Sequence, residues 1–149
     1  MPENVQDVAP SAVLAAREIR VVVGRLRRRL NETYDTGDLT PSQTSLLSRL
    51  DKDGAATASA LAAAERVRPQ SVAATLSVLE ERGLIERRPD PDDGRRQLVS
   101  VSAAGREFLG DRRRAGEEWL ARALHERFTE PQRHAVIEAM ALLDQLTHS

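Results

Sequence analysis

Residues 68–102, RPQSVAATLSVLEERGLIERRPDPDDGRRQLVSVS, contain the pattern of a short helix followed by a two-stranded ribbon. Pro69 suits the first turn of a helix, where its missing N–H needs no partner. Gly83 is placed to end that helix, because glycine adopts the left-handed cap conformation without steric cost. The apolar side chains between them recur at the spacing of one helix face, at Val72, Leu76 and Leu79. The stretch therefore predicts a helix with one buried side.

Two short β-type runs follow this helix, LIER at residues 84–87 and LVSV at residues 98–101. The segment between them, PDPDDGRR at residues 89–96, has Asp, Pro and Gly in positions that favour a turn. We therefore expect an antiparallel ribbon whose tip carries charged side chains of both signs.

The other side of the predicted helix carries short and mostly uncharged side chains, among them Gln70, Ser71, Ala74 and Thr75. Short side chains let a helix backbone approach a large surface closely. Gln and Ser can exchange hydrogen bonds with base edges, and a Thr methyl can touch a thymine methyl. The pattern predicts a helix that reads bases in the major groove, with Arg68 beside it on a phosphate or base edge. Arg95 and Arg96 at the ribbon tip are then placed to reach a phosphate or an adjacent minor groove.

The ribbon residues resemble the wing signature of the multiple antibiotic resistance regulator (MarR) family. The similarity lies in DGR at residues 93–95 and in LVSVSAAG at residues 98–105, and in motif order it covers about residues 39–105. Val101 and Ser102 stand where Leu and Thr are usual, and both changes keep the chemistry. The resemblance implies that Arg95 inserts near the minor groove and that Asp93 pairs with it to shape the wing.

Two further helices are predicted before this stretch. TPSQ at residues 40–43 is a capping-box pattern with proline at the first helical position, and Leu46, Leu47 and Leu50 give that helix a buried side. Thr57 is a suitable cap for an alanine-rich helix over residues 58–66. Because this helix is joined closely to the one that begins at Pro69, the pair predicts a helix-turn-helix.

Long helices are expected on both sides of this region, over residues 11–30 and 103–127, with Ser102 capping the second. A last helix begins at a second capping box, TEPQ at residues 129–132. Its apolar stripe is wide, and no later element in the chain can cover it. A second subunit is the simplest cover, and the same dimer is implied by the family resemblance.

The expected fold class is mainly α with a small two-stranded β-wing, a winged helix-turn-helix with N- and C-terminal dimerisation helices. Residues 1–38 are assigned to an N-terminal tail and dimerisation helix, residues 39–102 to the DNA-binding domain, and residues 103–149 to the C-terminal dimerisation helices.

The composition limits the other classes of function. The net charge is -1, so a general basic coat is excluded, although a local basic surface is sufficient for DNA binding. The absence of cysteine and of a long apolar run fits a cytoplasmic chain without disulfides or membrane spans. We find no catalytic constellation, no phosphate-binding glycine loop and no metal-ligand spacing. We therefore expect no enzyme activity and no cofactor.

The sequence thus predicts a homodimeric transcriptional regulator of double-stranded DNA, a repressor of a pseudo-palindromic operator. The resemblance implies that a small aromatic or lipophilic effector releases it, but no ligand-binding residue is identified. One alternative is a winged-helix module that binds protein; the polar face of the helix that begins at Pro69 counts against it. The other is an enzyme of small-molecule metabolism, for which no clustered acid, base or metal set is found.

Overall fold

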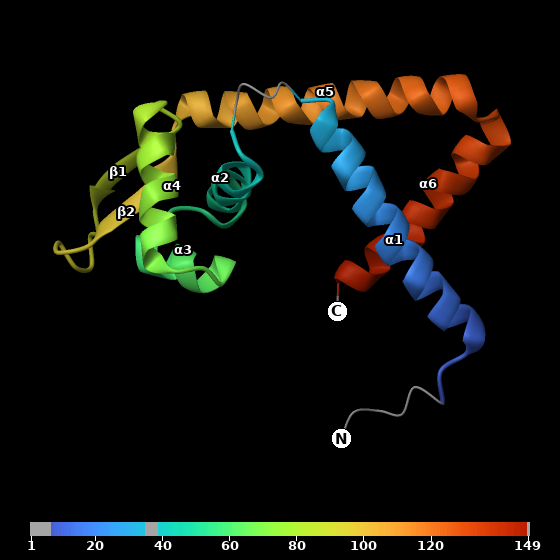
Figure 1. Ribbon diagram of the computed structural model, residues 1–149, viewed down its shortest axis with the longest axis horizontal. Helices are drawn as coiled ribbons and strands as arrows, with labels where there is room; N and C mark the ends of the chain where they lie inside the picture. Colours follow the sequence, from blue (N-terminus) through green and yellow to red (C-terminus); the bar gives the residue numbers. More distant parts are fainter. Residues whose placement is uncertain (1–6, 35–38, 149) are drawn as a thin grey trace. The chain divides into compact units, whose positions relative to one another are not determined.

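The computed structural model describes residues 7–34 and 39–148. Residues 1–6, 35–38 and 149, which include part of the predicted N-terminal tail, lie outside the described residues. The elements in chain order are α1 (Pro10–Glu32), α2 (Pro41–Asp53), α3 (Ala58–Glu65), α4 (Pro69–Glu81), β1 (Ile85–Pro89), β2 (Gln97–Val101), α5 (Ala103–Arg127), α6 (Glu130–Asp144) and the short 3-10 helix η2 (Gln145–Thr147) (Figure 1). The predicted fold class, mainly helical with a two-stranded wing, is confirmed.

The chain divides into two compact units. Unit 1 combines residues 1–34 with residues 115–149, and unit 2 is continuous, over residues 35–114. Helix α5 supplies its first turns to unit 2 and the rest to unit 1.

The predicted caps account for the helix starts. The Thr40 hydroxyl accepts the N–H of Gln43, whose side-chain oxygen accepts the N–H of Thr40 in return. Thr129 and Gln132 form the same reciprocal pair at the start of α6, so both predicted capping boxes are confirmed. Each box satisfies two N–H groups that a helix start leaves without partners. The Thr57 hydroxyl caps α3 by accepting the N–H of Ala60.

The core of unit 2 lies where α2, α3, α4 and the wing meet. The predicted anchors of α4 are all buried, and Leu76 and Leu79 have no exposed surface. Leu47 from α2 is likewise 0% exposed, and Leu61 from α3 is 2% exposed. Burial of these leucines fixes the orientation of α4, because a helix can bury only one side against a single core.

The wing is an antiparallel pair in which Ile85 lies opposite Val101 and Pro89 opposite Gln97. A third strand-like contact was not predicted from the sequence. Ala56, just before α3, exchanges both backbone hydrogen bonds with Val99, at 3.0 and 2.8 Å. This bridge joins the base of the wing to the start of the helix-turn-helix.

Ser102 joins the end of α4 to the start of α5. Its hydroxyl donates to the Gly83 carbonyl at 2.6 Å and accepts the N–H of Gly105 at 3.0 Å. Its own N–H donates to the carbonyl of Leu84 at 3.0 Å. The predicted role of Ser102 as a cap is confirmed, and the same side chain also ties α5 to the turn that follows α4.

Three described residues have a positive φ: Gly54 (87°), Gly83 (73°) and Arg66 (55°). Glycine adopts this region freely, whereas other residues are strained there by roughly 1–2 kcal/mol. Gly83 confirms the predicted end of α4. Arg66 is the C-terminal cap of α3 and has φ 55° and ψ 43°, the left-handed helical conformation.

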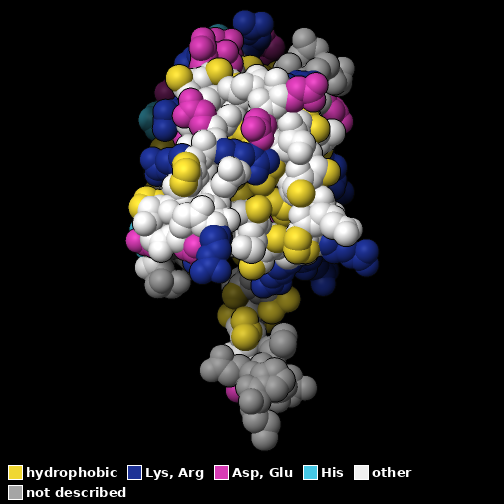
Figure 2. Space-filling model, turned by 90° about the vertical axis from the view of Figure 1, so that its left-hand side faces the viewer, with side chains coloured by type: hydrophobic (Ala, Val, Ile, Leu, Met, Phe, Trp, Pro, Cys, Tyr) yellow, Lys and Arg dark blue, Asp and Glu magenta, His cyan; other side chains and the backbone are white. Residues whose placement is uncertain are grey.

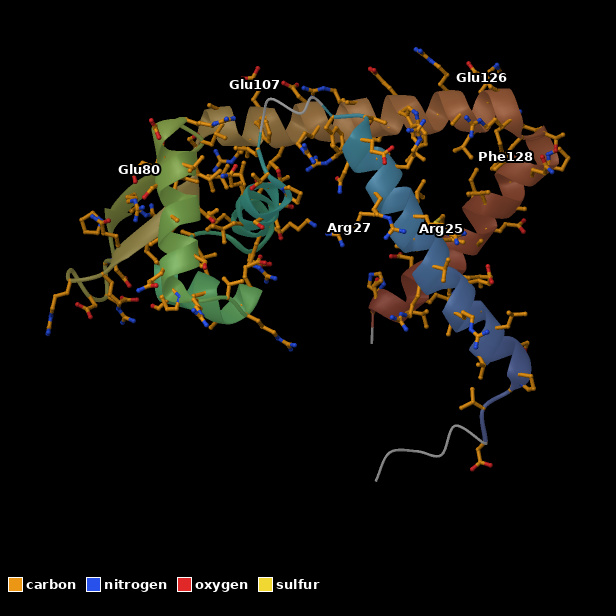
Figure 3. All side chains as sticks on the ribbon, in the orientation of Figure 1. Arg25, Arg27, Glu80, Glu107, Glu126 and Phe128 are labelled. Carbon is orange, nitrogen blue, oxygen red and sulfur yellow. The ribbon has the colours of Figure 1, made fainter. Side chains whose placement is uncertain are left out.

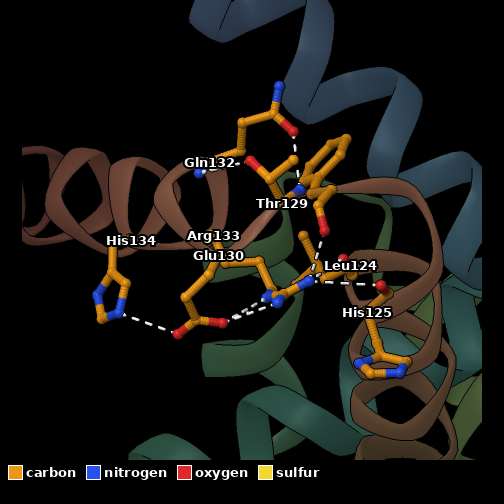
Figure 4. A network of polar contacts seen from close by, with 8 residues as sticks. Leu124, His125, Thr129, Glu130, Gln132, Arg133 and His134 are labelled. Atoms are coloured by element: carbon orange, nitrogen blue, oxygen red, sulfur yellow. Dashed lines mark hydrogen bonds and ion pairs between the residues drawn. The ribbon is translucent and has the colours of Figure 1, made fainter.

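In unit 1, Arg133 links the start of α6 to the end of α5 by hydrogen bonds (Figure 4). Arg133 of α6 donates to the carbonyls of Leu124 and His125 at the end of α5, at 3.3 Å each, and also to that of Phe128. Its guanidinium also binds Glu130 at 2.7 Å, and this contact lowers the pKa of the Glu130 carboxyl. A cation at a helix C-terminus satisfies free carbonyls and opposes the helix dipole.

Candidate nucleic-acid interface

Helix α4 has a buried apolar side and an exposed side of short, uncharged side chains. Its apolar residues face the core, whereas Gln70, Ser71 and Ala74 are exposed and Thr75 is half-buried. Within the described residues the Gln70 side chain makes no hydrogen bond. The predicted reading residues therefore share the outer side of one helix, and the amide of Gln70 is available to a partner.

Thr75 has a more restricted chemistry than its residue type suggests. Its hydroxyl donates to the Ser71 carbonyl one turn earlier, at 3.0 Å. A threonine hydroxyl has a single proton to donate. In this conformation Thr75 therefore presents a methyl group and an acceptor oxygen, but no donor.

The wing tip is organised by its aspartates. Asp93 accepts the backbone N–H of Arg95 at 3.1 Å, and its carboxylate lies 3.5 Å from Nε of Arg96 and 3.8 Å from Nε of Arg95. Asp90 similarly accepts the N–H of Asp92, at 2.9 Å. These turns use the carboxylates of Asp90 and Asp93 inside the loop, which reduces the repulsion that an acidic tip would exert on phosphate.

The arginines of this region are directed to solvent. The Arg95 side chain is 95% exposed, and that of Arg96 is 58% exposed. Arg68 is exposed at the N-cap position just before α4, where no side chain caps the helix. Seen from the side of the wing, Lys and Arg side chains lie at several points around apolar and uncharged ones (Figure 2). The surface therefore combines exposed arginines with short side chains that let another molecule approach α4 closely.

An ion pair that was not predicted from the sequence connects α4 to the wing. Arg87 on β1 binds Glu80, with 2.5 Å between Nε and Oε2. Glu80 lies at the end of α4 (Figure 3). The opposite charges of these two residues, seven positions apart on either side of the predicted helix end, were the sequence feature that could have indicated this ion pair. The pair joins α4 to the first wing strand, so it contributes to the position of the wing relative to the exposed side of α4.

Metal sites and membrane spans are both absent from the described part of the chain. Among residues 7–34 and 39–148, no group of three or more His, Asp or Glu side chains is arranged to hold a metal ion. No helix in the same residues is long and apolar enough to span a membrane.

Comparison with known proteins places this geometry in a family. The MarR family model matches residues 39–96, from just before α2 to the wing tip. The uncharacterized HTH-type transcriptional regulator Mb0904 of Mycobacterium bovis is 42% identical over 109 residues, which are 73% of this chain and 76% of that protein.

Solved structures agree with this assignment. A candidate transcriptional regulator from Pseudomonas aeruginosa is 37% identical, with a TM-score of 0.79 over 95% of this chain and 99% of its own. A variant of MepR from Staphylococcus aureus, in a structure bound to an oligodeoxyribonucleotide, has the same fold at 19% identity and a TM-score of 0.68, over 89% of this chain and 97% of its own. The chain belongs to the MarR family.

Proposed function

We propose that the chain is a homodimeric, sequence-specific DNA-binding transcriptional regulator that represses a pseudo-palindromic operator. The observation that carries the proposal is the division of α4, whose leucines are fully buried while Gln70, Ser71 and Ala74 remain exposed beside an arginine-bearing wing. The fold supports it, because a protein with this fold, MepR, is found bound to an oligodeoxyribonucleotide.

In this proposal α4 enters the major groove. Gln70, Ser71, Ala74 and Thr75 contact base edges, and Arg68 holds a phosphate or a base edge where α4 begins. The wing follows the backbone, so that Arg95 and Arg96 reach a phosphate or the adjacent minor groove, while Asp93 holds the loop. Residues 39–102 are then the DNA-binding domain.

The exposed apolar side chains of unit 1 support the proposal of a homodimer. Large apolar side chains lie exposed on α1, α6 and η2, more than scattered surface residues account for: Leu14, Val22, Val23, Leu26, Ile137, Met140, Leu142 and Leu146. We assign residues 1–38 and 103–149 to dimerisation. A two-fold dimer places its two recognition helices about 34 Å apart, one turn of B-DNA, which matches an inverted repeat.

The regulatory part of the proposal follows from the dimer. A small aromatic or lipophilic effector that binds better to a dimer with a different spacing of the two α4 helices shifts the population away from DNA. The shift is limited by the difference between the effector affinities of the two states. Transcription in vitro from a promoter that carries the selected DNA site, with and without protein, tests the repressor role.

Replacing Arg95 with Ala tests the contribution of the wing. We expect weaker binding to most DNA sequences, with a salt slope lower by about one for each phosphate that is no longer bound, or about two for the dimer. Affinities are measured by fluorescence anisotropy at several salt concentrations on random-sequence duplexes of about 30 base pairs, long enough for two half-sites. Arg106→Ala, which removes an exposed arginine of α5, is the control. Equal affinity and slope for Arg95→Ala and the unmodified protein would remove the wing from the proposal.

Replacing Gln70 with Ala tests base reading. The amide of Gln70 is exposed and makes no internal hydrogen bond with a described residue, so truncation leaves the fold intact. We expect relaxed preference at one base pair of each half-site, by roughly 1–3 kcal/mol for a bidentate contact. Binding to a set of single-base variants of the selected site measures the change. A uniform loss over all variants would identify Gln70 as a positioning residue instead of a reader.

A further inference from the structure

Helices α3 and α4 end in the same motif but with different residues. After α4, the N–H of Gly83 donates to the Glu80 carbonyl and that of Leu84 to the Leu79 carbonyl, both at 2.9 Å. After α3, the N–H of Arg66 donates to the Ala63 carbonyl at 3.3 Å, and that of Val67 donates to the Ala62 carbonyl at 3.1 Å. These paired bonds define a Schellman cap, whose left-handed position is normally occupied by glycine.

The chain therefore has an arginine where the backbone favours glycine. Gly54 and Gly83 occupy the other two positive-φ positions among the described residues. The side chain of Arg66 is exposed and has no ion pair or hydrogen bond with any described residue. Within the described chain, no contact of the guanidinium offsets the backbone strain.

The position of Arg66 in the chain determines which groups of a bound DNA its side chain could contact. It lies in the turn of the helix-turn-helix, three residues before Pro69, where α4 begins. In a helix-turn-helix the first residues of the recognition helix contact bases, while the helix before it crosses the sugar-phosphate backbone. A residue in the turn between the two helices therefore lies near both the groove and the backbone. Arginine suits such a position because its planar guanidinium binds phosphate with two parallel hydrogen bonds.

We propose that Arg66 is a DNA-backbone contact that binds a phosphate at the edge of the groove occupied by α4. The inference rests on the proposed function, since it requires α4 to enter DNA. It adds a residue that the sequence pattern did not identify and assigns it to affinity, because a phosphate contact carries no base information.

A purely structural role predicts different behaviour. A cation at the end of α3 interacts favourably with the helix dipole. If that were the reason for Arg66, its removal would destabilise unit 2 and would leave the DNA affinity of the folded protein unchanged. Glycine and asparagine both tolerate the left-handed conformation, so Arg66→Gly and Arg66→Asn remove the charge without adding strain.

The test compares Arg66→Gly, Arg66→Asn and Arg66→Lys with the control Arg106→Gln, which removes one exposed arginine from the first turn of α5. The probe is a duplex pool selected by the unmodified protein from random DNA. We expect the two neutral Arg66 variants to bind about 10-fold more weakly and to lower the salt slope by about two per dimer. Their base preference is unchanged, and their melting temperatures are not lowered, because both residues accept the left-handed backbone. Arg66→Lys keeps the charge and therefore the salt slope but loses part of the affinity, and Arg106→Gln binds almost normally.

The outcomes separate this inference from the proposed function. If the unmodified protein binds the selected duplexes and the neutral Arg66 variants match its affinity and salt slope, the inference alone is wrong. A melting temperature lowered by more than about 5 °C with unchanged affinity would assign Arg66 to the stability of α3 and would also overturn it. If the folded, unmodified protein enriches no duplex, the proposed function and this inference fail together.

Discussion

Replacing Ile137 with Glu is expected to convert the dimer to monomers and to weaken binding to an inverted-repeat duplex by at least about 100-fold, because two half-sites are no longer bound by one particle. Ile137 is 62% exposed on α6, so the charge meets solvent in a single chain and the fold of that chain is unaffected. In the proposed dimer the same side chain is buried, where an unpaired carboxylate is strongly unfavourable. Sedimentation velocity measures the assembly, and anisotropy measures the binding.

A matched control adds the same charge at Gln145, the residue that follows α6. Gln145 is exposed and polar, so Gln145→Glu should leave both the sedimentation coefficient and the DNA affinity close to those of the unmodified protein. A dimer that survives Ile137→Glu would show that the apolar side of α6 is not the dimer interface.

Replacing Gly105 with Ala is expected to destabilise unit 2 by about 3 kcal/mol, near the upper end for an overpacked site. An added Cβ at this position would lie 2.2 Å from the Leu84 carbonyl oxygen and 2.7 Å from Cγ1 of Val101. The first of these is a backbone atom held by the N–H of Ser102, so it cannot move aside without disturbing the junction of α4 and α5. Urea unfolding followed by circular dichroism measures the change.

Gly110→Ala on the same helix is the control for this change. An added Cβ there meets only the end of the flexible Arg114 side chain, at 3.6 Å. Alanine favours a helix interior over glycine by about 1 kcal/mol, so this variant should be as stable as the unmodified protein or more stable. Equal stability of Gly105→Ala and Gly110→Ala would contradict the close packing at the base of the wing.

The local signals in the sequence were sufficient to predict the helices and strands of unit 2. Pro69 and Gly83 mark the limits of α4, and threonine caps mark the starts of α2 and α3, because these residues act on neighbouring backbone groups. The wing followed from its strands and turn residues. Each of these predictions depends on contacts within a few positions along the chain.

Contacts between distant segments could not be predicted in the same way. Ala56 has no strand signal, and its pairing with Val99 arises only when the wing folds back against the start of α3. An added Cβ at the buried Gly116 would lie 2.7 Å from the hydroxyl oxygen of Tyr34, and this close approach of Tyr34 to α5 has no counterpart in the sequence pattern. Such roles depend on which surfaces meet in three dimensions.

The candidate interface was predicted in its residues but not in its details. The exposed positions of α4 follow from helix periodicity, so Gln70, Ser71 and Ala74 lie where expected. The bond from the Thr75 hydroxyl to the Ser71 carbonyl and the left-handed backbone of Arg66 depend on local conformation, which residue type alone does not specify. Whether these residues contact DNA remains a prediction.

The most direct test of the central claim is a bind-and-sequence selection with the purified protein on random double-stranded DNA at near-physiological salt. We predict an enriched inverted repeat whose half-sites are centred about one helical turn, ~34 Å, apart, as expected for two α4 helices in successive major grooves. A folded and dimeric protein that enriches no sequence would contradict the proposal and would favour a winged-helix module that binds protein.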